Sequence, residues 1–254
     1  MPDGVGILLA VLAILCGGVL KGAIGMGAPL IAIPVLAAIY NVPTAIALMT
    51  LPLLVSNIWQ MWKYQEGTEG RAALRLLVGG CVIGVVIGTM LLGALPEAWL
   101  SVGLALMILA YLSLLLSRPS LALSERRARG SAFPVGIVTG TLQGAAGLSS
   151  PVGATFIHAQ RLGRTSQVFA LSAMFFTLSA TQILALMGAG IMSWSLAGLS
   201  LAALIPTMTG VWIGQVVGAK VSHRTFERLT LSVIFVIAVG LLVDAVPELI
   251  SAPL

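Results

Sequence analysis

Long runs of apolar residues separated by short polar gaps dominate the chain. Six of these runs have the length that an α-helix needs to cross the roughly 30 Å of hydrocarbon in a membrane. They lie at approximately 44–62, 76–93, 99–117, 166–188, 195–217 and 229–244. The pattern therefore predicts six membrane-spanning helices.

Two further apolar runs, 4–40 and 132–160, are too long for one ordinary crossing. Each contains a cluster of Gly, Ser and Pro near its middle, and such a cluster interrupts a regular helix. We expect each run to form a broken helix pair. The pattern leaves open whether these pairs fully span the membrane or are re-entrant.

The two interruptions have related sequences. A constant offset of about 122 residues aligns Gly18 with Gly140, Gly22 with Gly144, Gly25 with Gly147 and Pro29 with Pro151. After a small insertion, Gly84 and Gly88 match Gly210 and Gly214. The chain is therefore predicted to contain two membrane repeats, 1–117 and 132–254, joined by a polar linker at 118–131.

Basic residues gather in three of the polar gaps, and loops rich in Lys and Arg face the cytoplasm. They are Lys63, Arg71 and Arg75, then Arg118, Arg126, Arg127 and Arg129, and then Lys220, Arg224 and Arg228. The linker is therefore predicted to be cytoplasmic, and both termini are predicted outside.

Arg161 and Arg164 bear on the relation between the repeats. They would lie outside if 132–160 crossed once, but inside if this run entered, broke near Gly147 and returned. The returning path obeys the charge rule and makes the two repeats begin on opposite sides. We therefore expect an inverted-topology repeat, each half a broken pair plus three transmembrane helices, as in many secondary transporters.

Composition supports an all-α integral membrane fold. Hydrophobic residues make up 59% of the 254 positions and charged residues 8%, with a mean hydropathy of +1.09. So few charges cannot coat a soluble body of this size, which excludes a soluble enzyme and a nucleic-acid binder. The 29 glycines and only 6% aromatic residues favour closely packed helices in a lipid bilayer over a β-barrel.

The two interruptions are the strongest candidates for a binding site. A new half-helix begins in each, and its free N–H groups and positive dipole end can bind an anion. The alternative is that these residues only let helices pack closely. The candidate substrate-binding positions here are Gly22, Gly25, Gly27, Pro29, Gly144, Gly147, Ser149, Ser150 and Pro151.

Lys21 is a basic residue inside the first interruption, and an ionisable residue within a membrane segment indicates function. It can donate to an anionic substrate, or it can reach an aqueous edge with its amine. Gln143, the matching residue of the second repeat, can also donate but carries no charge. Both are candidate substrate-binding residues.

Polar side chains also interrupt two predicted crossings. Asn57 and Gln60 lie on the first of them, and Gln182 lies on its counterpart. These residues can line a substrate path, or they can form hydrogen bonds between helices. We include all three among the candidate substrate-binding residues.

Several signatures are missing from the sequence. No Asp or Glu lies inside a predicted crossing, so a carboxylate proton relay and a carboxylate sodium site have no candidate residues. Nucleotide-binding, metalloprotease and serine-hydrolase motifs are also missing. We predict no metal, no cofactor and no enzymatic activity.

The chain resembles the sulfite exporter TauE/SafE family, also described as a sulfonate uptake permease family, over nearly its whole length. The resemblance rests on the segments Gly18 to Pro34, Ala45 to Tyr64, Gly140 to Pro151, Gly210 to Gly214 and Lys220 to Leu229. It implies an inner-membrane transporter of sulfite, sulfonates or related anions. Ala28, Ser149 and Ser150 stand where this family commonly has Gly runs, so the substrate can differ.

We therefore expect a secondary transporter that binds a small sulfur-containing oxyanion at the midplane between two broken glycine-rich helices. A passive anion channel is the first alternative, and a non-transporting membrane scaffold is the second. The sequence leaves open the exact substrate, the direction of transport, the coupling ion and the oligomeric state, a homodimer included.

Overall fold

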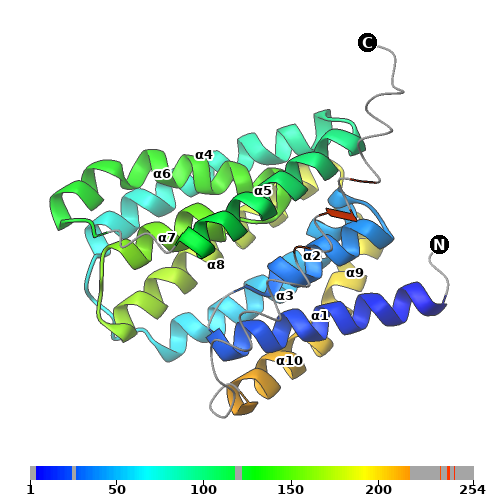
Figure 1. Ribbon diagram of the computed structural model, residues 1–254, viewed down its shortest axis with the longest axis horizontal. Helices are drawn as coiled ribbons and strands as arrows, with labels where there is room; N and C mark the ends of the chain where they lie inside the picture. The colour runs from blue at the N-terminus through cyan, green and yellow to red at the C-terminus, as the bar shows by residue number, and fades with distance from the viewer. Residues whose placement is uncertain are drawn as a thin grey trace. The chain divides into compact units, whose positions relative to one another are not determined.

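The computed structural model describes residues 4–24, 27–117 and 122–217, together with positions 235, 239, 240 and 243. Within these residues the fold consists of ten helices and contains no strand (Figure 1). The helices are α1 (Gly4–Ile24), α2 (Ala28–Ile39), α3 (Val42–Lys63), α4 (Arg71–Ala94), α5 (Glu97–Ser117), α6 (Glu125–Ala146), α7 (Ser150–Ala159), α8 (Arg164–Gly188), α9 (Trp194–Ala202) and α10 (Leu204–Val217).

Four of the runs predicted to cross the membrane form the long helices α3, α4, α5 and α8. The predicted crossing at 195–217 is divided at Ala203 into α9 and α10. Pro206, which has no backbone N–H, lies in the first turn of α10, where a helix does not need that donor. The predicted helix at 229–244 and the basic segment Lys220 to Leu229 lie outside the described residues, apart from the four single positions.

The apolar helices fit a protein that crosses the membrane several times. Five stretches of the described residues are long and apolar enough to span a bilayer: Gly4–Ala23, Val42–Lys63, Arg71–Ala94, Arg164–Gly188 and Trp194–Val216. Many large apolar side chains point outward from them, including Ile83 and Met90 on α4. Such exposure is costly in water but suits a lipid environment.

Both long interrupted runs form helix pairs, as predicted: α1 with α2, and α6 with α7. The helix α6 begins at Glu125, so its first turns lie within the predicted polar linker. Glu125 lies in the first turn, where a carboxylate is stabilised by the helix dipole. Charged residues extend this helix beyond the apolar run from which it was predicted.

The chain forms two compact units that differ from the two sequence repeats. Unit 1 contains Met1–Met49, Ala94–Ser117 and Trp194–Leu254, and unit 2 contains Thr50–Gly93 and Arg118–Ser193. Each unit therefore combines helices from both halves of the sequence. We describe each unit by itself.

In unit 1, α1 packs closely along α10. A Cβ atom added to Gly18 would lie 3.1 Å from the Cα atom of Gly210, and one added to Gly22 would lie 3.0 Å from the backbone nitrogen of Gln215. The same Cβ positions lie even closer to the backbone oxygens of Thr207 and Val211, nearer than real Cβ atoms come, so only glycine allows the approach. We refer to this α1–α10 contact as the first glycine seam.

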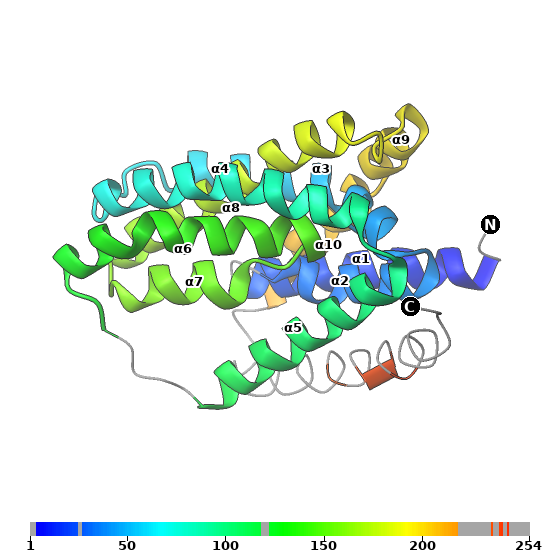
Figure 2. The ribbon, with the colours of Figure 1, turned by 90° about the horizontal axis from the view of Figure 1, so that it is seen from above.

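In unit 2, α4 packs in the same manner along α6, and the two helices lie side by side in both views (Figures 1 and 2). A Cβ atom on Gly84 would lie 2.9 Å from the Cα atom of Gly140, and one on Gly88 would lie 2.9 Å from that of Gly144. In both seams the contacting residue numbers rise together, so the paired helices are parallel. We refer to the α4–α6 contact as the second glycine seam.

The two seams correspond to each other through the sequence repeat. Gly18 and Gly210 of the first seam match Gly140 and Gly84 of the second. The broken helix of each half therefore packs against a helix from the other half, inside its own compact unit. The sequence analysis did not predict that each seam joins helices from different halves of the chain.

Candidate functional site

The break in unit 2 is a sharp turn between α6 and α7. Gly147 follows the last residue of α6 with a φ of 70°, a left-handed conformation that glycine adopts without strain. Its N–H donates to the carbonyl oxygen of Gln143 at 2.8 Å. Pro151 lies in the first turn of α7, where its ring favours the start of a helix.

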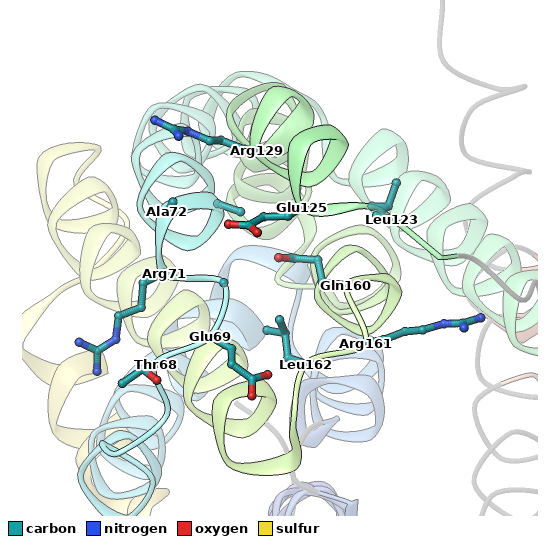
Figure 3. A pocket seen from close by; sticks show the side chains of 12 residues that line it. Thr68, Glu69, Arg71, Ala72, Leu123, Glu125, Arg129, Gln160, Arg161 and Leu162 are labelled. Carbon is teal, nitrogen blue, oxygen red and sulfur yellow. The ribbon is translucent and has the colours of Figure 1, made fainter.

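The chain returns after this break to the end of unit 2 from which α6 started. Just before α6, the N–H of Leu123 donates to the carbonyl oxygen of Ala159, the last residue of α7, at 2.8 Å. Arg129 near the start of α6 and Arg161 just after α7 line one pocket (Figure 3). Within unit 2, α6 and α7 therefore form a helical hairpin.

Three of the predicted site residues meet at this break. Gln143 on α6 donates through Nε2 to Oε1 of Gln182 on α8 at 2.8 Å. Ser149, directly before α7, donates through its hydroxyl to Oε1 of Gln143, also at 2.8 Å. All three side chains are buried, and we refer to them as the amide triad.

Gln182 also forms hydrogen bonds with backbone carbonyl groups at the end of α6. Its Nε2 donates to the carbonyl oxygen of Gln143 at 3.1 Å and reaches that of Gly144 at 3.5 Å. The last carbonyl groups of a helix have no partner within the helix, and buried ones need partners elsewhere. A side chain of α8 therefore adds a second donor to the Gln143 oxygen, which also accepts from Gly147, and approaches the Gly144 oxygen.

The N-terminus of α7 has no side-chain cap. Ser149 occupies the N-cap position, but its hydroxyl makes no hydrogen bond to the first turn of α7. An N-cap serine usually accepts from the amide two or three residues later. Here its hydrogen bond goes to Gln143 instead, which leaves the first turn of α7 without a capping oxygen from Ser149.

The break in unit 1 joins α1 to α2. Gly27 precedes α2 with a φ of 98°, and its carbonyl oxygen accepts from the N–H of Leu30 at 3.0 Å. Ala28 and Pro29 are buried at the start of α2. Gly25, a predicted site residue, lies outside the described residues.

Lys21 lies in the last turn of α1 and is buried, with 2% of its surface exposed. A cation at the carboxyl end of a helix is favoured by the helix dipole. A lysine that extends its amine to water normally leaves the end of its side chain accessible. The burial of Lys21 therefore favours the interpretation that it acts inside the protein.

The polar residues of α3 are buried too. Asn57 and Gln60 lie in the part of α3 that belongs to unit 2, and the hydroxyl of Ser172 on α8 approaches Oε1 of Gln60 at 3.5 Å. This contact links two helices, as the alternative interpretation of Gln60 proposed. Ser56 donates to the carbonyl oxygen of Leu53 on its own helix at 3.1 Å.

The structure also shows polar features that the sequence pattern missed. Thr89 on α4 is buried, and within the described part of the chain its hydroxyl has no hydrogen-bond partner. It follows the second glycine seam, since a Cβ atom on Gly144 would lie 2.7 Å from its backbone nitrogen. A threonine inside an apolar run gives no sequence signal that separates it from ordinary packing residues.

Unit 2 also contains a pocket of about 530 Å³ where the α3–α4 loop, the start of α6 and the α7–α8 loop meet (Figure 3). Glu69 fastens two of these loops, because its carboxylate accepts from the N–H of Gly163 at 2.6 Å. The side chains of Glu125 and Gln160 face the hollow, whereas Arg161 extends away from it. The pocket thus offers no convergent set of basic groups for an anion.

No group of three His, Cys, Asp or Glu side chains within the described ranges is placed to hold a metal ion. The amide triad lies at the break of unit 2, Lys21 lies at the break of unit 1, and neither helix that follows a break has a side-chain cap. The fold is thus that of a polytopic α-helical membrane protein with interrupted helices.

A family comparison identifies this class more closely. The model of the sulfite exporter TauE/SafE family matches residues 10–241, and the chain belongs to that family. The matched region includes both breaks and both glycine seams. Comparison with curated proteins gives no match, and comparison with solved structures gives none either.

Proposed function

We propose that this protein is a secondary transporter that binds small sulfur-containing oxyanions, such as sulfite or an organosulfonate, at its two helix breaks. Membership of the sulfite exporter family supports transport of a sulfur oxyanion. The main observation in support of this binding site is the amide triad. It brings three predicted site residues together beside the start of α7, which has no side-chain cap.

The chemistry of the breaks suits an anion. Backbone N–H groups at the start of a helix point outward together with the positive end of the dipole. Away from water, such donors interact more strongly with an anion than they do in solution. In unit 1 the buried amine of Lys21 can donate to a bound anion, and in its protonated form it offsets the charge of that anion.

The proposed setting is the inner membrane, with the linker between α5 and α6 in the cytoplasm and both termini outside. The parallel packing of α4 and α6 supports it, because the basic residues near the starts of these helices, among them Arg71 on α4 and Arg126 on α6, then lie at one end of unit 2. Labelling of a cysteine at position 126 in intact cells tests the orientation. This position should resist a membrane-impermeant reagent, whereas position 250 should react.

Uptake of labelled sulfite into liposomes that contain the purified protein tests the function. We expect saturable flux, inhibited by organosulfonates and independent of sodium, because no Asp or Glu lies within a predicted crossing. Flux that rises linearly with concentration, together with measurable anion current, would indicate the channel alternative. No flux and no sulfite binding would leave the scaffold alternative.

A further inference from the structure

Two backbone carbonyl groups fix the hydrogen-bond directions in the amide triad. A carbonyl oxygen only accepts, so the Gln182 atom that lies 3.1 Å from the Gln143 oxygen and 3.5 Å from the Gly144 oxygen must be the donating Nε2. The other atom of this carboxamide, Oε1, only accepts, and it faces Gln143 at 2.8 Å. The carbonyl groups at the end of α6 therefore fix which atom of the Gln182 carboxamide is nitrogen and which is oxygen.

The same logic extends from Gln182 to Ser149. Gln143 must present Nε2 to the accepting oxygen of Gln182, which turns its own Oε1 toward Ser149 at 2.8 Å. An amide oxygen cannot donate, so the Ser149 hydroxyl gives its single hydrogen to Gln143. The amide ambiguity that usually affects glutamine side chains is thereby removed.

We infer that Gln182 is a positioning residue of the proposed transport site, a role that rests on the proposed function. Its Nε2 donates to the backbone carbonyl oxygens at the end of α6, and its Oε1 accepts from Nε2 of Gln143 and so fixes the orientation of that side chain. Ser149 has no hydrogen left for an anion. Within the triad, the second amide hydrogen of Gln143 is the donor that the described residues leave for a substrate.

A double-mutant cycle tests this role by measuring binding of labelled sulfite to the purified full chain. Gln182→Leu should weaken binding about tenfold by releasing Gln143, and Gln143→Leu should weaken it by a similar factor. The double variant should bind no more weakly than Gln143→Leu alone, because Gln182 acts through Gln143. Additive losses, or unchanged affinity in Gln182→Leu, would overturn the inference.

Two further variants separate positioning from general damage. Gln182→Met keeps the length of the side chain but can neither donate to the α6 carbonyls nor give Gln143 an amide oxygen, so it should reproduce the loss seen with Gln182→Leu. Gln160→Leu removes a carboxamide at the pocket of Figure 3, outside the triad, and should bind sulfite like the wild type. Wild-type binding by Gln182→Met would overturn the positioning role.

Hydrogen exchange tests the arrangement without any substrate. The amide of Gly147 is protected by its bond to the Gln143 carbonyl, which Gln182 also holds. Gln182→Leu should speed exchange in the peptide 143–153 at least tenfold, whereas Gln160→Leu should not. If wild-type protein binds no sulfite, the proposed function fails. Unchanged exchange in Gln182→Leu would overturn the positioning role in either case.

Discussion

The break in unit 1 places Lys21 three residues before the end of α1, and the break in unit 2 places Gln143 three residues before the end of α6. The helices that follow, α2 and α7, also begin at positions that match in the repeat. The backbone plan is thus the same, but one break contains a buried lysine and the other a network of neutral side chains. The two halves therefore share the backbone geometry of the break but place different polar side chains at it.

The two breaks therefore offer an anion different kinds of donor. A lysine attracts negative charge but fixes little about direction, since its three hydrogens rotate freely. A carboxamide held at both ends donates along one fixed line. We therefore expect unit 1 to determine how strongly an anion binds, and unit 2 to determine which oxygen geometry is accepted.

The largest expected effect tests whether the two seams are equivalent. Gly84→Val and Gly210→Val each bring a Cβ atom to about 3 Å from a facing glycine Cα, and each should lower stability by about 3 kcal/mol or more. Thermal unfolding of the purified variants in detergent measures this. Gly103→Val on α5 is the control, because nothing lies within 4 Å of its Cβ position.

The result distinguishes two views of the fold. Comparable losses at Gly84 and Gly210 would support seams that hold their units in the same manner. Tolerance of valine at one seam and collapse at the other would show that the repeat has diverged there in packing as well as in chemistry.

The next effect concerns the backbone of the breaks. Gly147→Val should abolish sulfite transport while the protein still inserts, because a β-branched residue at a φ of 70° costs about 1–3 kcal/mol and disturbs the turn. Gly147→Asn is the matched control, since asparagine tolerates this conformation, and it should keep most of the flux. Uptake at equal membrane abundance is the measurement.

The first repeat offers the parallel experiment. Gly25→Val should have the same result, because Gly25 matches Gly147 in the sequence. Normal flux in both valine variants would remove the breaks from the transport site.

The third prediction measures the chemical difference between the breaks. Lys21→Ala should weaken sulfite binding by about 1.5–3 kcal/mol, whereas Gln143→Ala should weaken it by about 1 kcal/mol, because hydrogen bonds to charged groups contribute more. Equilibrium binding at low salt gives both values. Unchanged affinity in Lys21→Ala would assign the lysine a structural role.

Selectivity between sulfite and methanesulfonate should depend more on Gln143 than on Lys21, the reverse of the order expected for affinity. If unit 2 fixes the oxygen geometry, Gln143→Ala should change the ratio of sulfite to methanesulfonate affinity more than Lys21→Ala does. An equal change in both variants would contradict the division between the units.

Periodicity and hydropathy were sufficient to predict much of this fold. Apolar length located α3, α4, α5 and α8, and the Gly and Pro clusters located both breaks, because these signals act locally along the chain. The start of α6 at Glu125 was missed because hydropathy marks which residues avoid water rather than which are helical.

Partners distant in sequence were harder to predict. Gln143, Ser149 and Gln182 were proposed separately, but nothing local indicates that they bond to one another across 39 residues. The pairing of helices from different halves in each glycine seam was also missed, although the matching glycines were recognised. Such pairings depend on how helices assemble, and a single sequence does not encode them in any local pattern.

The smallest expected effects come from two carboxylates, one in each unit, that accept from the amide at the start of another segment. Glu97 accepts from the N–H of Val42, the first residue of α3, at 2.8 Å, and Glu69 accepts from that of Gly163 before α8. Val42 is buried and its hydrogen bond to Glu97 is partly buried, whereas the Glu69 contact is exposed to solvent. Water can therefore replace a lost acceptor more readily at the Glu69 contact.

Glu97→Ala should therefore destabilise the protein by about 1–2 kcal/mol, because it leaves a buried N–H without its acceptor. Glu69→Ala should cost about 0.5 kcal/mol, since water then solvates Gly163. Thermal unfolding gives the total change, and hydrogen exchange in the first turns of α3 and α8 locates it. A larger loss for Glu69→Ala would mean that this carboxylate holds the α3–α4 and α7–α8 loops together more firmly than a solvent-exposed hydrogen bond can.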